Sequence, residues 1–339
     1  MTVRILADDL TGALDAAAPF AAPDAPVRLL LRGARAPGNA GLSISSESRD
    51  LPPEAARAAV ARAHAALRAT GDDGAIWFKK VDSVLRGNSI LETVETMRLG
   101  GFGTCLFAPA FPGMGRRTRD GMHEVADGDG WVSAPVHDLM AAFAGLGVHA
   151  RPLDPGDPGT GLMVADALDQ GDLDRAVAAL RDRGDLLWAG SRGLAEALSG
   201  GAPALPLPRI ATVVIGTTHP ASRAQIAAAA TFFADGRMLI DPVPKAPDAA
   251  ATARAIAAAV PQIETGAGRA LMVIGGDTLS AVLDAAGVEA LDCIGEVGPG
   301  LPLSIIRGGR LDGARMVSKS GGFGRPDLLV RMLGGDWPG

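Results

Sequence analysis

Short apolar runs alternate with alanine-rich stretches of helical character along most of the chain. In the first part, the apolar runs predict strands at residues 3–7, 27–31, 42–45, 75–79, 104–108, 161–165 and 185–189. The stretches between them predict helices at residues 13–18, 54–69, 90–99, 136–144 and 173–181. Because strands that alternate with helices form parallel sheets with both faces covered, this part is predicted to be α/β.

The same alternation resumes after a segment rich in glycine and proline. Residues 199–208 predict a linker, since glycine and proline interrupt both helices and strands. Beyond it the pattern predicts strands at residues 211–215, 237–240, 271–274, 304–307 and 314–318, and helices at 221–233, 248–260, 279–286 and 327–333. We therefore expect two Rossmann-like three-layer α/β domains with largely parallel sheets, at residues 1–202 and 203–339.

Composition narrows the classes of function. A length of 339 residues agrees with two domains. The net charge of −6, the aromatic content of 4% and the absence of tyrosine disfavour a nucleic-acid partner. Only two cysteines are present, which excludes a disulfide framework, and no apolar run is long enough to span a membrane. We expect a soluble cytoplasmic protein.

Two carboxylates follow the first predicted strand. Asp8 and Asp9 stand where ligands gather in open α/β sheets, at the carboxyl ends of the strands. They could orient substrate hydroxyls, accept a proton or hold Mg²⁺ through water. The alternative is that Asp9 or Thr11 only caps the next helix, but capping accounts for one acidic residue and not for two.

A cluster of charges follows the strand predicted at residues 75–79. Lys79, Lys80, Asp82 and Arg86 could grip a carboxylate or phosphate, and a guanidinium suits a carboxylate better than a lysine does. The alternative is an ordinary solvated run of charges. Arg49 follows another strand and offers a second guanidinium. The proline-bounded loop at residues 108–118 contains two arginines and is either a binding element or a stiff connector.

Small residues follow three predicted strands of the second half. The stretch 271–283 reads as a buried strand, a Gly275-Gly276 turn and a helix for which Asp277 and Thr278 are suitable N-caps. Free backbone N–H groups and the helix dipole would favour a phosphate there, although many α/β proteins use two glycines simply to leave a strand. The other two turns are residues 216–219, which include His219, and 318–324, where Lys319 could grip a phosphate. A lone histidine more often satisfies local hydrogen bonds.

Several sequence signatures are absent. The chain has no Gly-Lys pair for a Walker A loop and no G-x-G-x-x-G dinucleotide fingerprint. Neither a complete nucleophile elbow nor the protein-kinase catalytic signature occurs. The five histidines lack metal-ligand spacing, so we expect no protein-held metal site.

Together, the motifs resemble those of the four-carbon acid sugar kinase family. In the N-terminal part these are DDLTGA (8–13), KKVDSVLRGN (79–88), APAFP (108–112) and GSRGLA (190–195). In the C-terminal part they are GGDT (275–278), GEVGPGLP (295–302) and KSGGFG (319–324). They follow the family's order over nearly the whole chain.

The resemblance implies a kinase with an N-terminal acid-sugar domain, a C-terminal nucleotide domain and a cleft between them. It implies transfer of a phosphoryl group from ATP, with Mg²⁺, to the terminal 4-hydroxyl of a tetronate or 3-oxo-tetronate. Carried over by motif, the candidate catalytic residues are Asp8, Asp9 and Asp82, and the substrate-binding residues are Arg49, Lys80 and Arg86. The candidate nucleotide contacts are Thr217, His219, Gly275, Gly276, Asp277, Thr278, Lys319, Gly321 and Gly322.

Two other functions remain open at this point. One is a ligand-binding or regulatory protein on the same scaffold without catalysis, against which the joint presence of Asp8, Asp9, Arg86 and the GGDT turn speaks. The other is an NAD(P)-linked oxidoreductase, which the missing glycine fingerprint disfavours. The sequence leaves open whether the protein is a homo-oligomer.

Overall fold

The chain forms two compact α/β units. The computed structural model describes residues 2–31, 40–71, 74–154, 156, 159–201, 203–234, 236–246, 248–264, 266 and 268–337. One unit contains Met1–Phe20 and Ala36–Ala202, and the other contains Ala21–Arg35 and Pro203–Gly339. Residue 202, at the boundary expected from the sequence, lies outside the described residues.

The N-terminal unit is built on a parallel sheet with the strand order β3-β1-β4-β11-β5-β10-β9. Its strands are β1 (Val3–Ala7), β3 (Gly41–Ser45), β4 (Ile76–Lys80), β5 (Thr104–Ala108), β9 (Ala150–Pro152), β10 (Gly161–Val164) and β11 (Leu186–Gly190). All residues of β1, β5 and β11 are buried, as expected for strands covered on both faces.

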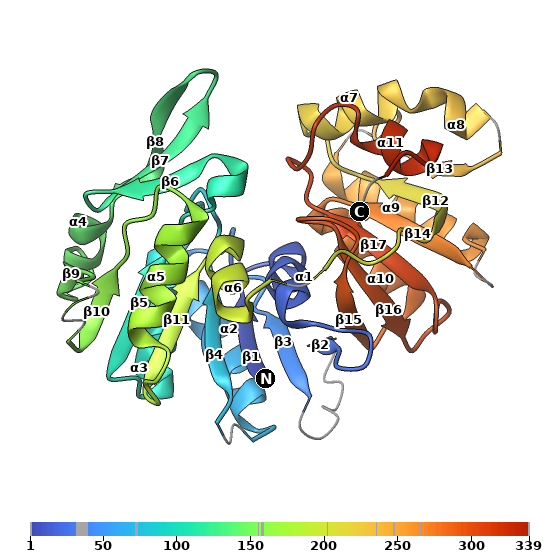
Figure 1. Cartoon of the computed structure of the whole chain (residues 1–339). Helices are drawn as coiled ribbons and strands as arrows, with labels where there is room; N and C mark the ends of the chain where they lie inside the picture. Colours follow the sequence, from blue (N-terminus) through green and yellow to red (C-terminus); the bar gives the residue numbers. More distant parts are fainter. Residues whose placement is uncertain are drawn as a thin grey trace. The chain divides into compact units, whose positions relative to one another are not determined.

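Helices cover both faces of this sheet. They are α1 (Leu10–Ala17), α2 (Pro53–Arg68), α3 (Ser89–Gly100), α4 (Leu139–Ala144), α5 (Gln170–Leu180) and α6 (Arg192–Ser199), with short 3₁₀ turns at Ala18–Phe20 and Pro112–Met114. Right-handed crossovers place α2 and α3 together on one face and α1, α5 and α6 on the other, as Figure 1 shows.

An antiparallel arm extends from the N-terminal unit, in the region where the sequence predicted a loop and the start of a helix. Its strands are β6 (Arg116–Arg119), β7 (Met122–Asp127) and β8 (Gly130–Asp138). The helix predicted at residues 136–144 begins only at Leu139, because Asp138 caps it by accepting a hydrogen bond from the backbone N–H of Ala141. The arm projects past the sheet of its unit (Figure 1).

The C-terminal unit has a mixed sheet with the strand order β13-β12-β14-β17-β16-β15-β2. Its strands are β2 (Val27–Leu30), β12 (Arg209–Ile215), β13 (Met238–Ile240), β14 (Arg269–Ile274), β15 (Ala290–Glu296), β16 (Pro302–Arg307) and β17 (Arg315–Lys319). Strands β13, β12, β14 and β17 are parallel, whereas β16, β15 and β2 pair antiparallel.

The helices of the C-terminal unit form two groups. They are α7 (Pro220–Ala228), α8 (Ala230–Ala234), α9 (Ala249–Ala259), α10 (Gly276–Ala286) and α11 (Leu328–Gly334), with a 3₁₀ turn at Val260–Gln262. Helices α7, α8 and α11 pack together, and α9 packs against α10. The predicted α/β class with largely parallel sheets is confirmed. None of the described helices is long and apolar enough to cross a membrane.

The segment Ala21–Arg35 belongs with the C-terminal unit although it precedes most of the N-terminal unit in the chain. Its strand β2 pairs antiparallel with β15. Arg28 of β2 holds Asp292 of β15 through two hydrogen bonds of 2.6 and 3.0 Å. The division expected from the sequence, at residues 202 and 203, did not include this segment, since pairing between distant strands leaves no local signal.

Candidate functional site

Three neighbouring strands of the N-terminal unit end at the same edge of the sheet. Strand β1 pairs in parallel with β3 on one side and with β4 on the other. Asp8 and Asp9 follow β1, Arg49 lies four residues past the last residue of β3, and Lys80 ends β4. Polar residues far apart in the sequence are thereby brought to one place.

Arg49 joins the two aspartates of this edge. Its Nε and Nη2 donate to the two carboxylate oxygens of Asp8 at 2.8 and 3.0 Å, and its Nη1 donates to Asp9 at 2.5 Å. Burial opposes ionisation of Asp8, but the charges of Arg49, Lys79 and Lys80 outweigh it, so the pKa of Asp8 is lowered. Both carboxylates are therefore ion-paired acceptors.

The turn after β4 contains the third aspartate. Arg86 donates from Nε and Nη2 to the Asp82 carboxylate at 2.8 and 2.7 Å, and the backbone N–H of Arg86 donates to it at 3.0 Å. Arg49 Nη2 lies 3.9 Å from Asp82 Oδ1. Burial would raise the pKa of Asp82, but the hydrogen bonds from Arg86 and the charges of Arg49 and Arg86 hold it well below its ordinary value.

The two adjacent lysines of β4 have different roles. Lys79 is fully buried and its Nζ lies 2.8 Å from Glu92 Oε2, while Ser48 Oγ donates to Glu92 Oε1 at 2.7 Å. Lys80 Nζ donates to the carbonyl oxygen of Val81 at 3.0 Å, and the charges of both lysines lower the pKa of Asp8. Gly12 lies beside this group, since a Cβ built on it would be 3.6 Å from Lys80 Nζ and 3.7 Å from Asp8 Oδ1 and would collide with Asp9 Oδ1. The structure thus brings together all six residues that the sequence singled out in this domain.

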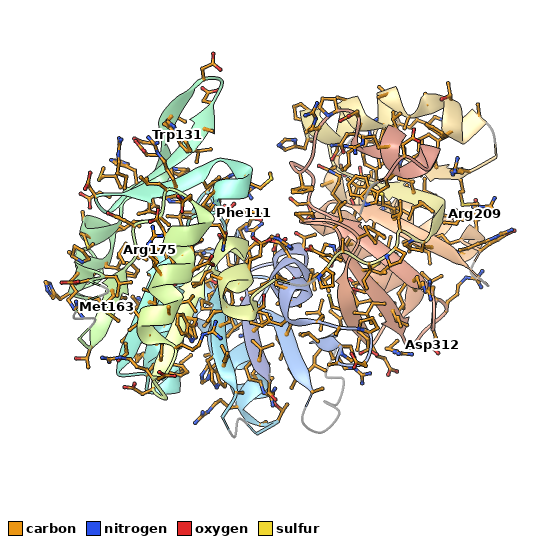
Figure 2. All side chains as sticks on the ribbon, viewed as in Figure 1. Phe111, Trp131, Met163, Arg175, Arg209 and Asp312 are labelled. Carbon is orange, nitrogen blue, oxygen red and sulfur yellow. The ribbon has the colours of Figure 1, made fainter. Side chains whose placement is uncertain are left out.

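The antiparallel arm is tied to the turn that contains Asp82. His123 of β7 is buried, with Nε2 at 2.8 Å from the carbonyl oxygen of Ser83 and Nδ1 at 3.1 Å from Thr118 Oγ1. Burial lowers the pKa of His123, which favours the neutral ring. In Figure 2, Phe111 lies near the base of the arm and Trp131 farther out along it. No local sequence pattern indicates this anchor, because the link depends on the register of β6 and β7.

Three glycine-containing turns lie together in the C-terminal unit. Strands β12, β14 and β17 are neighbours in a parallel arrangement, and the turns at 216–219, 275–278 and 320–324 follow their carboxyl ends. The three turns identified from the sequence therefore meet at one edge of the sheet. Helices α7 and α10 both begin there.

Helix α10 starts earlier than the sequence predicted. Gly275, and not Asp277 or Thr278, is the N-cap, with φ of 104° and no side-chain capping bond. Thr278 Oγ1 instead accepts a hydrogen bond from the backbone N–H of Gly216 at 2.9 Å, which ties two of the turns together. The first N–H groups of α10 are left without a side-chain cap, an arrangement that suits an anion.

Small residues keep this edge open around Thr217 and His219. A Cβ on Gly321 would lie 2.9 Å from Thr217 Oγ1, and a Cβ on Gly322 would lie 3.1 Å from His219 Nε2. His219 also caps α7, since its Nδ1 accepts from the backbone N–H of Ala221 at 3.2 Å. Side chains on Gly321 or Gly322 would crowd these contacts. We call the edge formed by the turns at 216–219, 275–278 and 320–324 the glycine cradle, and its open space depends on glycine at these two positions.

Lys319 holds the third turn from inside. Its buried Nζ donates to Ser222 Oγ at 3.0 Å and to the carbonyl oxygens of Ser320 and Phe323 at 2.9 and 2.8 Å. Burial lowers the pKa of Lys319 to about 7. All three donors are directed to acceptors of the chain, so the contacts of Lys319 fix the shape of the glycine turn.

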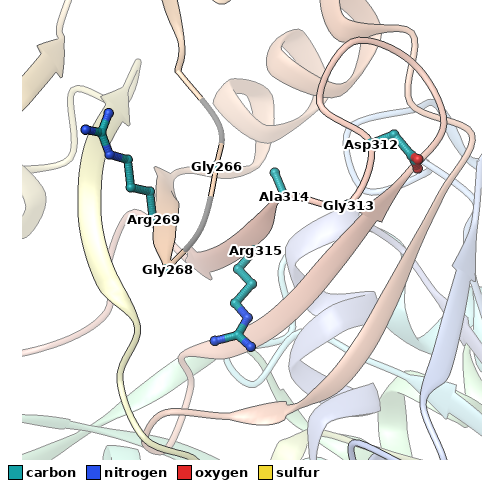
Figure 3. Close-up of a pocket in the computed structure, with 7 residues that line it drawn as sticks. All are labelled: Gly266, Gly268, Arg269, Asp312, Gly313, Ala314 and Arg315. Atoms are coloured by element: carbon teal, nitrogen blue, oxygen red, sulfur yellow. The ribbon is translucent and has the colours of Figure 1, made fainter.

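A pocket of about 390 Å³ lies at the other end of the same strands (Figure 3). Arg269 and Arg315, which begin β14 and β17, are among its lining residues, together with Asp312. The glycine turns follow the last residues of these strands, so the pocket is at the opposite sheet edge. None of the predicted nucleotide contacts lines it.

The groups present suit a triphosphate more clearly than a protein-held metal. The uncapped start of α10 and the glycine cradle offer backbone N–H groups and space for phosphate oxygens. Among the described residues, no group of three or more His, Cys, Asp or Glu side chains could hold a metal ion. Asp277 in the first turn of α10 is an acidic side chain near the cradle.

Two family models match separate parts of the chain. Residues 3–144 match a family model described as a sugar-binding N-terminal domain, and residues 234–329 match one described as a nucleotide-binding C-terminal domain. The first range includes Asp8, Asp9, Arg49, Lys80, Asp82 and Arg86, and the second includes the candidate nucleotide contacts from Gly275 to Gly322 but not Thr217 and His219.

Relatives that match nearly the whole chain are known. D-threonate kinases of Bordetella bronchiseptica and Cupriavidus necator are each 31% identical to this chain, over 97% of it and 96% of the relative. A crystal structure from Salmonella typhimurium LT2 has the same fold, with a TM-score of 0.75 at 18% identity over 97% of this chain and 98% of that one. The chain therefore belongs to the four-carbon acid sugar kinase family.

Proposed function

We propose that the protein uses ATP to phosphorylate the terminal 4-hydroxyl of a four-carbon acid sugar, a tetronate or 3-oxo-tetronate. One observation carries this proposal: Asp8, Asp9 and Asp82 are gathered with Arg49, Lys80 and Arg86 at one sheet edge of the unit that matches a sugar-binding domain. Carboxylates can orient several hydroxyls at once, and the neighbouring cations lower the pKa of Asp8 and of Asp82.

The proposed acceptor of the hydroxyl proton is Asp9. Its side chain is 21% exposed, against 2% for Asp8 and 8% for Asp82, so it is the most accessible of the three carboxylates. Oδ1 accepts from the backbone N–H of Gly12 at 2.6 Å, and Oδ2 accepts from Thr11 Oγ1 at 3.0 Å. These bonds fix the carboxylate in one orientation. Asp8 and Asp82 then act as positioning groups for substrate hydroxyls and for Arg49.

The proposed nucleotide site is the glycine cradle of the C-terminal unit. Phosphoryl transfer depends mainly on positioning and on stabilising the charge of the transferring group. The N–H groups at the start of α10 and the turn at 320–324 would hold the phosphates, with Thr217 and His219 beside them. Mg²⁺, bound chiefly by the phosphates and with Asp277 as a candidate protein ligand, would neutralise part of their charge.

The experiment is an assay of ADP release with purified protein, ATP and Mg²⁺ over erythronate, threonate and their 3-oxo derivatives. We expect ADP release that depends on one of these acids, with the product phosphorylated at the 4-position by ³¹P NMR. ADP release that no acid stimulates would contradict the proposal and favour a ligand-binding protein. Thermal stabilisation by NAD(P) and none by ATP would favour an oxidoreductase.

A further inference from the structure

Strand β6 contains three arginines, and only two of them are neutralised by a carboxylate. Arg117 Nε lies 2.7 Å from Glu124 Oε2, and Arg119 Nη2 lies 3.6 Å from Glu124 Oε1. Arg116 makes no ion pair with any carboxylate in the described ranges of the chain. The three arginines are on one strand, so the lack of an ion pair at Arg116 results from the position of its side chain and not from a separate location in the fold.

The guanidinium of Arg116 is partly buried and incompletely hydrogen-bonded. Its Nη1 donates to the carbonyl oxygen of Met114, while its Nε is buried without a hydrogen-bond partner among the described residues. Burial lowers the pKa of Arg116, and the charges of Asp82 and Arg86 act on it in opposite directions. A buried donor without an acceptor is unfavourable, and an anionic ligand would relieve that penalty.

The backbone holds Arg116 beside the turn that contains Asp82. Arg116 and Phe111 exchange two backbone hydrogen bonds of 2.9 and 3.1 Å across the loop after β5. His123, two strand positions away in the neighbouring β7, binds the carbonyl oxygen of Ser83, the residue after Asp82. This support fixes the position of the guanidinium before any ligand binds, which lowers the entropic penalty of binding.

The other guanidinium groups of this edge are already engaged. Arg49 binds Asp8 through two of its nitrogens and Asp9 through the third, and Arg86 binds Asp82 through two nitrogens. A substrate carboxylate at either group would compete with an aspartate already bound there. At Arg116 it would meet a cation with an unused, buried donor.

We propose that Arg116 binds the carboxylate of the acid sugar and so selects acids over neutral sugars. This rests on the proposed kinase function and adds the residue that recognises the acid group. The aspartates at the ends of β1 and β4 are then left to contact hydroxyls. A planar guanidinium with two parallel donors matches a carboxylate better than an ammonium does.

The test compares the wild type with Arg116→Gln, Arg116→Lys and the control Arg119→Gln. The substrate is the best acid of the panel, and its carboxamide serves as a neutral analogue of the same shape. For Arg116→Gln we expect the KM for the acid to rise about 10- to 100-fold, as for loss of a hydrogen bond to a charged group. The KM for ATP and for the carboxamide should stay the same. Arg116→Lys should raise the acid KM less, and Arg119→Gln should leave it unchanged.

The outcomes separate the two proposals. If the wild type phosphorylates an acid but Arg116→Gln keeps the same KM for that acid and the same preference over the carboxamide, the carboxylate assignment is overturned. If no acid binds to or is phosphorylated by the wild type, the kinase proposal fails and the Arg116 proposal fails with it. If Arg116→Gln does not fold by circular dichroism, Arg116→Lys decides, and an unchanged acid KM there overturns the assignment.

Discussion

Asp9 combines a structural role with a proposed chemical one. It is the N-cap of α1 through Gly12, and it is also the most exposed carboxylate of the cluster. The sequence raised both readings as alternatives, and the structure shows the cap directly. One side chain can serve both purposes because a carboxylate has two oxygens, of which Oδ1 caps the helix and Oδ2 meets Arg49.

Replacing Asp9 by asparagine should separate these roles. Asparagine caps helices as well as aspartate does, so we expect the fold to be retained. Without the carboxylate, kcat should fall by roughly 100-fold or more, as for loss of a general base. ATP binding, measured by calorimetry, should be unchanged. Asp138→Asn, which alters an exposed N-cap on α4, is the control and should keep full activity. Normal turnover by Asp9→Asn would refute the assigned role.

Lys319 provides a prediction about pH. Its pKa is about 7 in the folded protein because of burial, against 10.5 for an ordinary lysine. Between these values the unfolded chain binds a proton that the folded protein lacks, so this residue makes stability rise with pH from about 7 to about 10. In urea unfolding, the free energy of unfolding of the wild type minus that of Lys319→Met should increase from about pH 7 to about pH 10. A difference that does not vary with pH would contradict this.

At the residue scale, the sequence identified the candidate cluster but not all of its supports. Charged residues that follow buried strands stand out locally, which is why Asp8, Asp82 and Arg86 could be named. The ion pair of Lys79 with Glu92 could not be predicted from the sequence, since it joins a strand to the next helix. This pair neutralises Lys79 inside the unit, although the charge of Lys79 also acts on Asp8.

At the scale of elements, the turn before α10 is a part of the proposed nucleotide site where an added methyl group would meet both close neighbours and an unfavourable backbone conformation. Gly275 has a φ of 104°, and a Cβ there would lie 3.1 Å from Thr278 Oγ1 and 3.2 Å from Thr217 Cβ. Gly287 ends the same helix with a φ of 67°, and a Cβ there would have Gly309 Cα as its nearest neighbour, at 3.9 Å. Both glycines have a positive φ, but Gly287 is in the left-handed helical region with ψ of 33°, whereas Gly275 has ψ of 146°, where residues other than glycine are hardly found.

Gly275→Ala and Gly287→Ala therefore form a matched pair. Gly287→Ala should lower stability by about 1 kcal/mol, because alanine is strained in the left-handed region, and Gly275→Ala should lower it by about 2 to 3 kcal/mol, because its backbone conformation is less accessible to alanine. Only Gly275→Ala should also weaken ATP binding, by about tenfold or more, since it disturbs the contacts of Thr217 and Thr278 at the proposed cradle. Unfolding curves and calorimetric titrations with ATP measure the two effects. Equal ATP affinities of the two variants would argue against the cradle as the nucleotide site.

The arm shows where element prediction from this sequence was wrong. The pattern indicated a loop at 108–118, whereas β6 begins at Arg116. Of the helix predicted at 136–144, residues 139–144 are helical and the first three belong to β8, which forms an antiparallel sheet with β6 and β7. Most residues of β8 are exposed, so its sequence lacks the alternation of apolar and polar residues by which a strand is predicted. Strands β9 and β15 and helix α6 were also not predicted. Their positions are fixed mainly by neighbours distant in the chain.

At the scale of the whole molecule, one buried carboxylate holds the early segment 21–35 on the C-terminal unit. Asp292 of β15 is 2% exposed and accepts from Arg28 of β2 and from Arg307 of β16, the latter at 2.5 Å. Burial would raise the pKa of Asp292, but the hydrogen bonds and charges of the two arginines lower it overall. This carboxylate links three neighbouring strands.

Asp292→Asn should lower the free energy of unfolding by about 3 kcal/mol, as when one partner of a buried ion pair is removed. Asp292 stabilises the fold fully above its ordinary pKa of about 4, and this stabilisation is lost as the pH falls through the lowered pKa of Asp292 in the folded protein. The gap between wild type and variant in denaturant unfolding should therefore narrow in strong acid. Glu264→Gln, which breaks an exposed pair with Arg269, should change stability by less than about 1 kcal/mol. If Asp292→Asn also lowered the free energy of unfolding by less than about 1 kcal/mol, the proposed role of Asp292 in holding the three strands together would be contradicted.

The sequence by itself determined the α/β class, the family and the residues at the ends of strands. These depend on local hydrophobic periodicity and on short motifs, which are read within a few positions of each other. Only the tertiary structure decided that segment 21–35 joins the C-terminal unit, that Lys79 pairs with Glu92, and that Arg116 lies beside the turn of Asp82 with no carboxylate partner among the residues that the structure describes. Strand pairing and burial bring such residues together across long stretches of chain, and a linear pattern does not record that proximity.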